Sequence, residues 1–153
     1  MKRFIMLFIA AFFFACGSIN STETQMLDTT ATPQPTLSWI DSVELMAEAF
    51  AIQESRCTPD AVSPDGLYVG CLQISKIMVR EANRLLGEDL YSYDDRYNPD
   101  YSVAMFKVVM EHRNPELSVD RAIELWNEHA PLSYRQNVHH YYDSLMCNAI
   151  ANL

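Results

Sequence analysis

An acidic residue on the apolar face of a predicted helix constrains this chain more than any other feature. The face consists of residues three or four positions apart, the spacing of one side of an α-helix: Ile40, Val43, Ala47, Phe50 and Glu54. Ser38 and Asp41 are typical of a helix start. Thr58-Pro59 prevents the helix from continuing. Glu54 is therefore expected near the helix end, on the buried side.

This position suits Glu54 for acid catalysis. Burial disfavours the charged carboxylate and raises its pKa, whereas an exposed glutamate is ionised near neutral pH. A carboxyl group that keeps its proton can donate it to a leaving oxygen. The alternative is a helix-terminal glutamate that faces solvent or pairs with Arg56 or Arg80.

Four more helices are predicted after the first. Ser75 begins a second helix and Gly87 ends it, and Asn98-Pro99 begins a third. Ser118 begins a fourth, and the last covers about residues 133–151. Turn residues between 57 and 69 are compatible with a small hairpin. The predicted fold is mainly α, with about five helices and at most one small β-hairpin near Glu54.

The first 36 residues are expected to lie outside this domain. Residues 1–15 have a basic start and an apolar run too short to span a bilayer, which indicates a signal peptide. Phe13-Phe14-Ala15-Cys16 resembles a bacterial lipoprotein cleavage box, which implies a lipidated Cys16. The alternative is an ordinary secretory signal. Residues 16–36 have the composition of a flexible tether, and 37–153 are predicted to form one domain.

Charge and composition limit the partners. The formal net charge of -9 disfavours nucleic acid and anionic lipid, so membrane attachment is expected through the lipid anchor only. Gly17 after the cysteine resembles outer-membrane lipoproteins, which places the domain in the bacterial envelope, facing the periplasm. The four histidines lack ligand spacing, so we expect neither metal nor cofactor. We also expect a monomer.

The remaining cysteines are Cys57, Cys71 and Cys147. An oxidising compartment favours one disulfide among three possible pairings. Cys57–Cys71 is the pairing we favour, because it would close the loop beside Glu54 and leave Cys147 free. The alternative is that all three are buried thiols.

An ordered set of motifs resembles the lysozyme-like lytic transglycosylase family, specifically the soluble lytic transglycosylase catalytic domain. The family has Glu-Ser at a helix end, a glycine-rich segment ending in Gln, a later Tyr-Asn pair and a tyrosine on the last helix. The matching residues, over roughly 39–146, are Glu54-Ser55, Ala61 to Gly66 with Gly70 to Ile74, Trp126-Asn127 and Tyr134.

The resemblance implies a lysozyme-like domain that cleaves the β-1,4 MurNAc-GlcNAc bond of peptidoglycan. Glu54 would be the single general acid/base, and Tyr134 would orient it or the intermediate. Ser55 would support Glu54 or contact sugar. Five residues of the chain would be in contact with the substrate or close to it: Ser55, Gly70, Gln73, Asn127 and Tyr134.

Other interpretations stay open. Asp60 or Asp65 could supply a second carboxylate, although both also suit turns. Tyr91, Tyr93 and Tyr97 could form a wall on which sugars stack. One residue more than the family spacing lies between Gly66 and Gly70. The alternative function is therefore a non-catalytic peptidoglycan-binding lipoprotein of the same fold, and a purely structural envelope lipoprotein is a third class.

Overall fold

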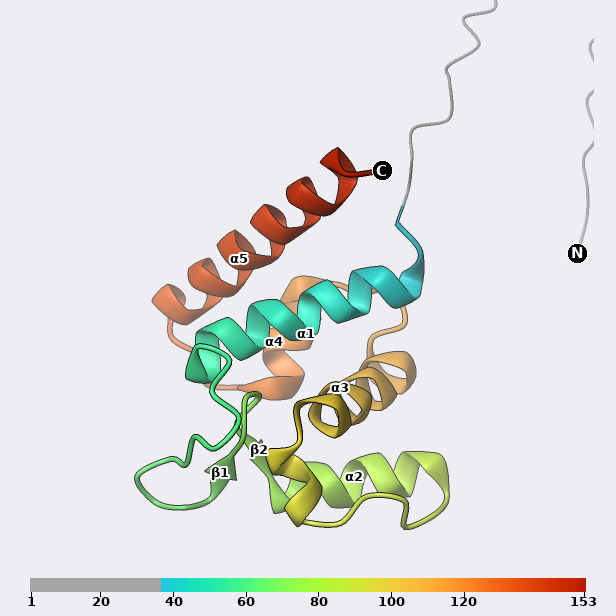
Figure 1. The fold of residues 1–153 in the computed structure, drawn as a ribbon, viewed down its shortest axis with the longest axis vertical. Helices are drawn as coiled ribbons and strands as arrows, with labels where there is room; N and C mark the ends of the chain where they lie inside the picture. Colours follow the sequence, from blue (N-terminus) through green and yellow to red (C-terminus); the bar gives the residue numbers. More distant parts are fainter. Residues whose placement is uncertain (1–36) are drawn as a thin grey trace, which may run out of the picture. The chain divides into compact units, whose positions relative to one another are not determined.

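The computed structural model describes residues 37–153, which form five α-helices and one two-stranded hairpin (Figure 1). The prediction of a mainly α fold with a small β-hairpin is confirmed. The elements follow in this order: α1 (Trp39–Ser55), β1 (Tyr68–Val69), β2 (Ile74–Ser75), α2 (Lys76–Leu86), a 3-10 turn (Asp94–Tyr97), α3 (Pro99–Arg113), α4 (Val119–Trp126) and α5 (Leu132–Ala151). The predicted signal peptide, tether and lipidated Cys16 lie outside the described residues.

Side-chain caps set the helix starts close to where the sequence predicts them. Ser38 accepts a hydrogen bond from the backbone N–H of Asp41, and the Asp41 side chain accepts one in return from the Ser38 N–H. The side chains of Ser75, Asn98 and Ser118 likewise accept hydrogen bonds from backbone N–H groups in the first turns of α2, α3 and α4. These bonds satisfy N–H groups that have no partner within a helix.

The core is centred on α1. Helix α5 lies along α1, and α3 packs against both α1 and α2 (Figure 1). Phe50 of α1 is fully buried, with its ring centroid 5.3 Å from that of Phe106 in α3. The ring centroid of Trp126, at the end of α4, lies 4.9 Å from that of Phe106. This aromatic cluster fixes the ends of α1 and α4 next to each other.

The hairpin is attached to the helices through Arg96, a buried residue of the 3-10 turn. Its guanidinium donates to the carbonyl of Ile74 in β2 at 3.2 Å, and its own carbonyl accepts from the Ser102 hydroxyl at 2.9 Å. The strands are antiparallel, with Val69 opposite Ile74. The second strand leads directly into α2, and residues 70–73 form the short connection between the two strands.

The predicted Cys57–Cys71 disulfide is not present. Cys57, Cys71 and Cys147 are all free thiols. Cys71 is buried in the core beside Leu72, whereas Cys57 is exposed in the turn after α1. The alternative of three buried thiols is also wrong, because only Cys71 is buried.

Among the helices of residues 37–153, none combines the length and the apolar character that crossing a membrane requires.

Candidate active site

A pocket of about 340 Å³ lies where α1, the hairpin and α4 meet. Its lining residues come from these three places: Glu54, Ser63, Tyr68, Gln73, Trp126 and Asn127. The fold thus brings together three residues that the sequence analysis assigned to one site, namely Glu54, Gln73 and Asn127. Of the six described residues that line the pocket, only Glu54 has a carboxyl group.

The carboxyl group of Glu54 is largely removed from water. Burial raises the pKa of Glu54 above its ordinary value, and a hydrogen bond from Tyr134 opposes part of this rise. Within residues 37–153 no lysine or arginine forms an ion pair with Glu54, so the alternative of a pair with Arg56 or Arg80 is wrong. The net direction is toward a glutamate that holds its proton at higher pH than an exposed one.

Tyr134 of α5 fixes the orientation of this carboxyl group. Its hydroxyl donates to Oε1 of Glu54 at 2.5 Å, and the tyrosine is itself buried. Burial first, and then the charge of Glu54, raise the pKa of Tyr134 well above its ordinary value. The phenol therefore keeps its proton and acts as a donor. Oε2 of Glu54 has no hydrogen-bond partner in the described part of the chain, which leaves it free for a ligand.

Ser55 connects the end of α1 to the hairpin. Its hydroxyl donates to the carbonyl of Cys71 at 2.8 Å and accepts from the N–H of Thr58 at 2.9 Å. Ser55 does not line the 340 Å³ pocket, but it lines a second hollow beside Glu54. These bonds favour the first of the two predicted roles, in which Ser55 supports Glu54 by holding the end of α1 against the segment that carries Gln73.

Gly70 is also a structural residue. Its N–H donates to Ala61 O at 2.8 Å, and its carbonyl accepts from the N–H of Gln73 at 3.1 Å. A Cβ atom at position 70 would lie 1.9 Å from the carbonyl oxygen of Arg96, and φ is +80°. The N–H and the carbonyl of Gly70 are thus both bonded within the turn, and Gly70 is not among the residues that line the 340 Å³ pocket.

Gln73 lines the same pocket as Glu54, and its side-chain amide is held in place by hydrogen bonds. Nε2 donates to Gly70 O at 2.9 Å and to Ala61 O at 3.3 Å. Both bonds use the amide nitrogen, and within residues 37–153 no donor binds Oε1. The backbone of Gln73 has φ of +49°, a left-handed conformation in which a non-glycine residue is strained. This turn sets the position of the side chain as a hydrogen-bond acceptor.

Trp126 and Asn127, at the end of α4, also line the 340 Å³ pocket. The Trp126 Nε1–H donates to Leu72 O at 3.2 Å, so the indole is tied to the hairpin segment as well as to the core. The Asn127 backbone ends α4 through a bond to Ile123 O. Its side-chain amide lines the pocket and has no bonded partner among the described residues. An amide and an indole face are groups that proteins use to bind sugars by hydrogen bonding and stacking.

Two lining residues, Ser63 and Tyr68, were missed by the sequence analysis. Both lie in the small hairpin region, where the Ser63 N–H donates to Tyr68 O at 2.9 Å. The sequence signals in this region were the turn at Asp65-Gly66 and the motif segment from Ala61 to Gly66, which contains Ser63. The tyrosines that the sequence offered instead do not line this pocket: Tyr93 and Tyr97 are exposed, and Tyr91 lies in a different hollow.

Asp60 and Asp65 do not act as a second carboxylate in this pocket. Both are exposed, and neither lines it. Asp65 accepts from the Ser63 hydroxyl and from the N–H of Leu67 at 3.0 Å, which makes it a turn residue. These two bonds, the serine bond first, lower the pKa of Asp65.

Glu54 also lies at the edge of a second hollow of about 570 Å³. This hollow lies beside the last turn of α1 and is bordered by Arg56, Asn137 and Tyr141. Glu54 thus borders two hollows, the 340 Å³ pocket and the 570 Å³ hollow. A ligand longer than one pocket can contact both sides of Glu54.

Comparisons of this chain with protein-family models, with curated proteins and with solved structures found no match. Within residues 37–153, no group of three or more His, Cys, Asp or Glu side chains is arranged to hold a metal ion.

Proposed function

We propose that this chain cleaves the β-1,4 bond between MurNAc and GlcNAc in peptidoglycan, as a lytic transglycosylase or a muramidase. The observation that carries the proposal is the environment of Glu54. Its carboxyl group is largely buried, its pKa is raised by burial, and it is oriented by Tyr134 at the edge of a pocket with polar and aromatic walls. Those are the requirements for a general acid that acts near neutral pH.

The reaction begins with protonated Glu54. Tyr134 holds Oε1, so the proton resides on Oε2, and Oε2–H donates it to the glycosidic oxygen as the C1–O bond breaks. The leaving sugar departs as an alcohol. Glu54, now a carboxylate, then takes a proton from the nucleophile. If the nucleophile is the 6-hydroxyl of the same sugar, O6 bonds to C1 and a 1,6-anhydro ring forms. If it is water, a reducing end forms.

The isolation of Glu54 supports a mechanism with one carboxylate. Glycosidases with two carboxylates place them on opposite sides of the scissile bond, about 5 to 10 Å apart. Neither predicted second acid lines the pocket, and Asp65 is bonded within its own turn. A single acid/base with an internal hydroxyl nucleophile needs no second carboxylate to activate water.

The location implied by this substrate agrees with the sequence-based proposal for residues 1–36. A lipidated Cys16 and a tether over 16–36 would hold the domain in the bacterial envelope, where peptidoglycan lies. This part of the proposal depends on the sequence alone.

The function is tested by incubating the protein with purified peptidoglycan sacculi and analysing the soluble muropeptides. Products with 1,6-anhydro ends are expected for a lytic transglycosylase, and products with reducing ends for a muramidase. Sacculi that remain intact while the protein sediments with them would establish the binding function instead. Intact sacculi without co-sedimentation would contradict both.

Tyr134→Phe is expected to change the pH dependence of cleavage. The substitution removes the hydrogen bond that lowers the pKa of Glu54, so burial alone then sets that pKa and it rises. The limb of the pH–rate profile that reports Glu54 should move to higher pH. The maximal rate should fall by about tenfold, which corresponds to the free energy of one hydrogen bond to a charged group. A lower rate with an unmoved profile would show that Tyr134 contributes only to the fold.

A further inference from the structure

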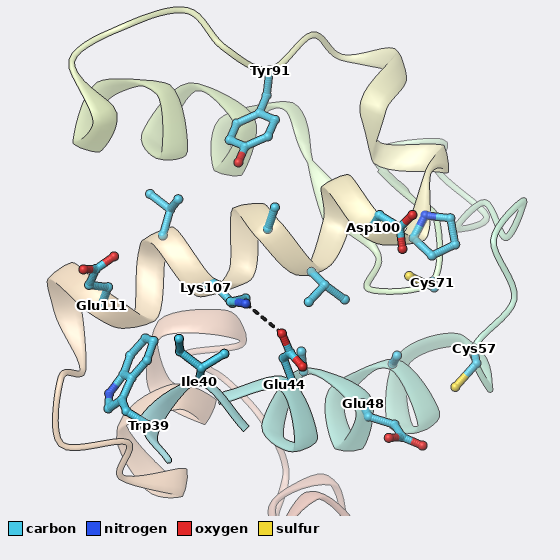
Figure 2. A pocket seen from close by; sticks show the side chains of 16 residues that line it. Trp39, Ile40, Glu44, Glu48, Cys57, Cys71, Tyr91, Asp100, Lys107 and Glu111 are labelled. Carbon is cyan, nitrogen blue, oxygen red and sulfur yellow. Dashed lines mark hydrogen bonds and ion pairs between the residues drawn. The ribbon is translucent and has the colours of Figure 1, made fainter. Parts of the chain in front are cut away.

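A separate concave region of the described domain lies away from Glu54, between α1 and α3 (Figure 2). It has a volume of about 920 Å³ and none of the residues that line the Glu54 pocket contributes to it. The proposed reaction does not use this groove. Its existence follows from small side chains on the facing helices: Ala47 and Ala51 on α1, and Ala104 on α3. An alanine in such a position leaves open space that a larger residue would fill.

The floor and one end of the groove are apolar. Val103 and Val108 of α3 border it, and Ile40 of α1 is 56% exposed there. Trp39 lines the same end, with its indole N–H bonded to Pro115 O at 2.9 Å, so the ring is held in place with an apolar face toward the hollow. These side chains offer apolar area on which the apolar groups of a partner can pack.

Carboxylates stand at both ends of the groove. Figure 2 shows Glu111 near Trp39 at one end, and Glu48 and Asp100 at the other. The lysine that lines the groove, Lys107, points to Glu44 from the facing helix and is bonded to it at 2.8 Å. In the described part of the chain the other three acids form no salt bridge. The groove therefore combines apolar side chains, crossed by the neutralised Glu44–Lys107 pair, with uncompensated negative charge at its ends.

This charge distribution decides between occupants. A second copy of the chain has a net charge of -9 and would be repelled. The chain's own segment 17–36 contains Glu23 and Asp28 and no lysine or arginine, so it does not complement the groove either. A segment with apolar residues and flanking cations complements both the floor and the ends.

We propose that the groove between α1 and α3 binds a basic, amphipathic helical segment of another protein. Asp100 and Glu111 are eleven residues apart on α3, a distance of about 16 Å along a helix axis, which corresponds to about three turns of a bound helix. Apolar side chains repeating every three to four residues fill the space above the alanines, and Lys or Arg near each end of the segment pairs with the acids. The site is separate from Glu54, so the proposal does not depend on glycan cleavage.

The test uses a synthetic 14-residue amphipathic peptide with a leucine stripe and lysines on the other positions. Titration of the ¹⁵N-labelled protein should give saturable chemical-shift changes at Ala51, Val103 and Ala104, and salt should weaken the binding. Two matched peptides are the controls: one with glutamate in place of lysine, and one with serine in place of leucine. Binding of either control with equal affinity, or shift changes confined to other surfaces, would overturn the proposal, as would no binding at all.

Variants test the two parts of the groove separately. Glu48→Gln with Glu111→Gln is expected to weaken peptide binding by about two- to fivefold for each carboxylate removed. The matched control, Glu88→Gln with Asp143→Asn, changes the net charge equally at exposed positions outside the groove and should leave the affinity unchanged. Ile40→Ser, at an exposed position, should weaken binding through lost apolar contact. Equal effects of the groove pair and the control pair would contradict a specific site.

Discussion

Replacing Glu54 by Gln is expected to reduce the release of soluble muropeptides from sacculi by about 10²- to 10⁴-fold, the usual contribution of a general acid/base. The amide has the same shape and can still accept the hydrogen bond from Tyr134, but its NH2 group is not acidic enough to transfer a proton to the glycosidic oxygen. Glu48→Gln, six positions earlier on α1 and exposed, is the matched control and should cleave at the wild-type rate. The measurement is the initial rate of muropeptide release.

The fold of Glu54→Gln can be checked through its pH-dependent stability. Because burial raises the pKa of Glu54, the native state keeps a proton that the unfolded chain has released. The wild type therefore has its full stability below the unfolded pKa of about 4.3 and loses part of it as pH rises through the native pKa. Glutamine has no such dependence, so the stability of the variant relative to wild type should increase as the pH rises above the unfolded pKa of the glutamate and through its raised native pKa. An inactive variant without this trend would indicate altered folding, and a variant with wild-type activity would refute the role of Glu54.

Gly70→Ala is expected to destabilise the domain by about 3 kcal/mol or more. The new Cβ would lie 1.9 Å from a backbone oxygen of Arg96, which cannot move without breaking the contacts between the hairpin and α3. The left-handed φ of +80° adds strain for alanine. Denaturant unfolding of the two proteins, with comparable slopes, measures the difference.

Gly66→Ala is the matched control for that substitution. Gly66 has a similar left-handed conformation, with φ of +70°, but a Cβ there would meet no atom within 4 Å. The control should therefore be destabilised only by the strain of an alanine at positive φ, which lowers the free energy of unfolding by about 1 kcal/mol. A loss for Gly70→Ala no larger than that for Gly66→Ala would contradict the close packing of the turn against Arg96.

The helices could be predicted from sequence because local chemistry sets their ends. Ser38, Ser75, Asn98 and Ser118 bind backbone N–H groups within their own first turns, and Gly87 adopts the left-handed conformation that ends α2. Each signal acts over three or four residues, so it does not depend on the tertiary fold. The helical spacing of Val43, Ala47 and Phe50 likewise placed Glu54 on the inner face, where burial raises its pKa, whereas Ile40 at the start of the same pattern is exposed.

Contacts between distant segments could not be predicted in this way. The bond from Ser55 to Cys71 O and the contact of Gly70 with Arg96 join residues 16 and 26 positions apart, and no local pattern distinguishes them from sugar-binding groups. The proposed disulfide failed for a similar reason, because the sequence does not show that Cys71 is buried while Cys57 is exposed. The groove between α1 and α3 results from three alanines that each look like ordinary core residues.

The two tryptophans of this chain give it a separate fluorescence reporter for each proposed site. Trp126 lines the Glu54 pocket, and Trp39 lines the groove between α1 and α3. Indole emission depends on local polarity and on quenching by nearby groups, so a glycan fragment should alter the signal of Trp126 and a helical peptide that of Trp39. Trp39→Phe, which leaves Trp126 as the single emitter, would allow glycan binding to be followed optically without any attached dye.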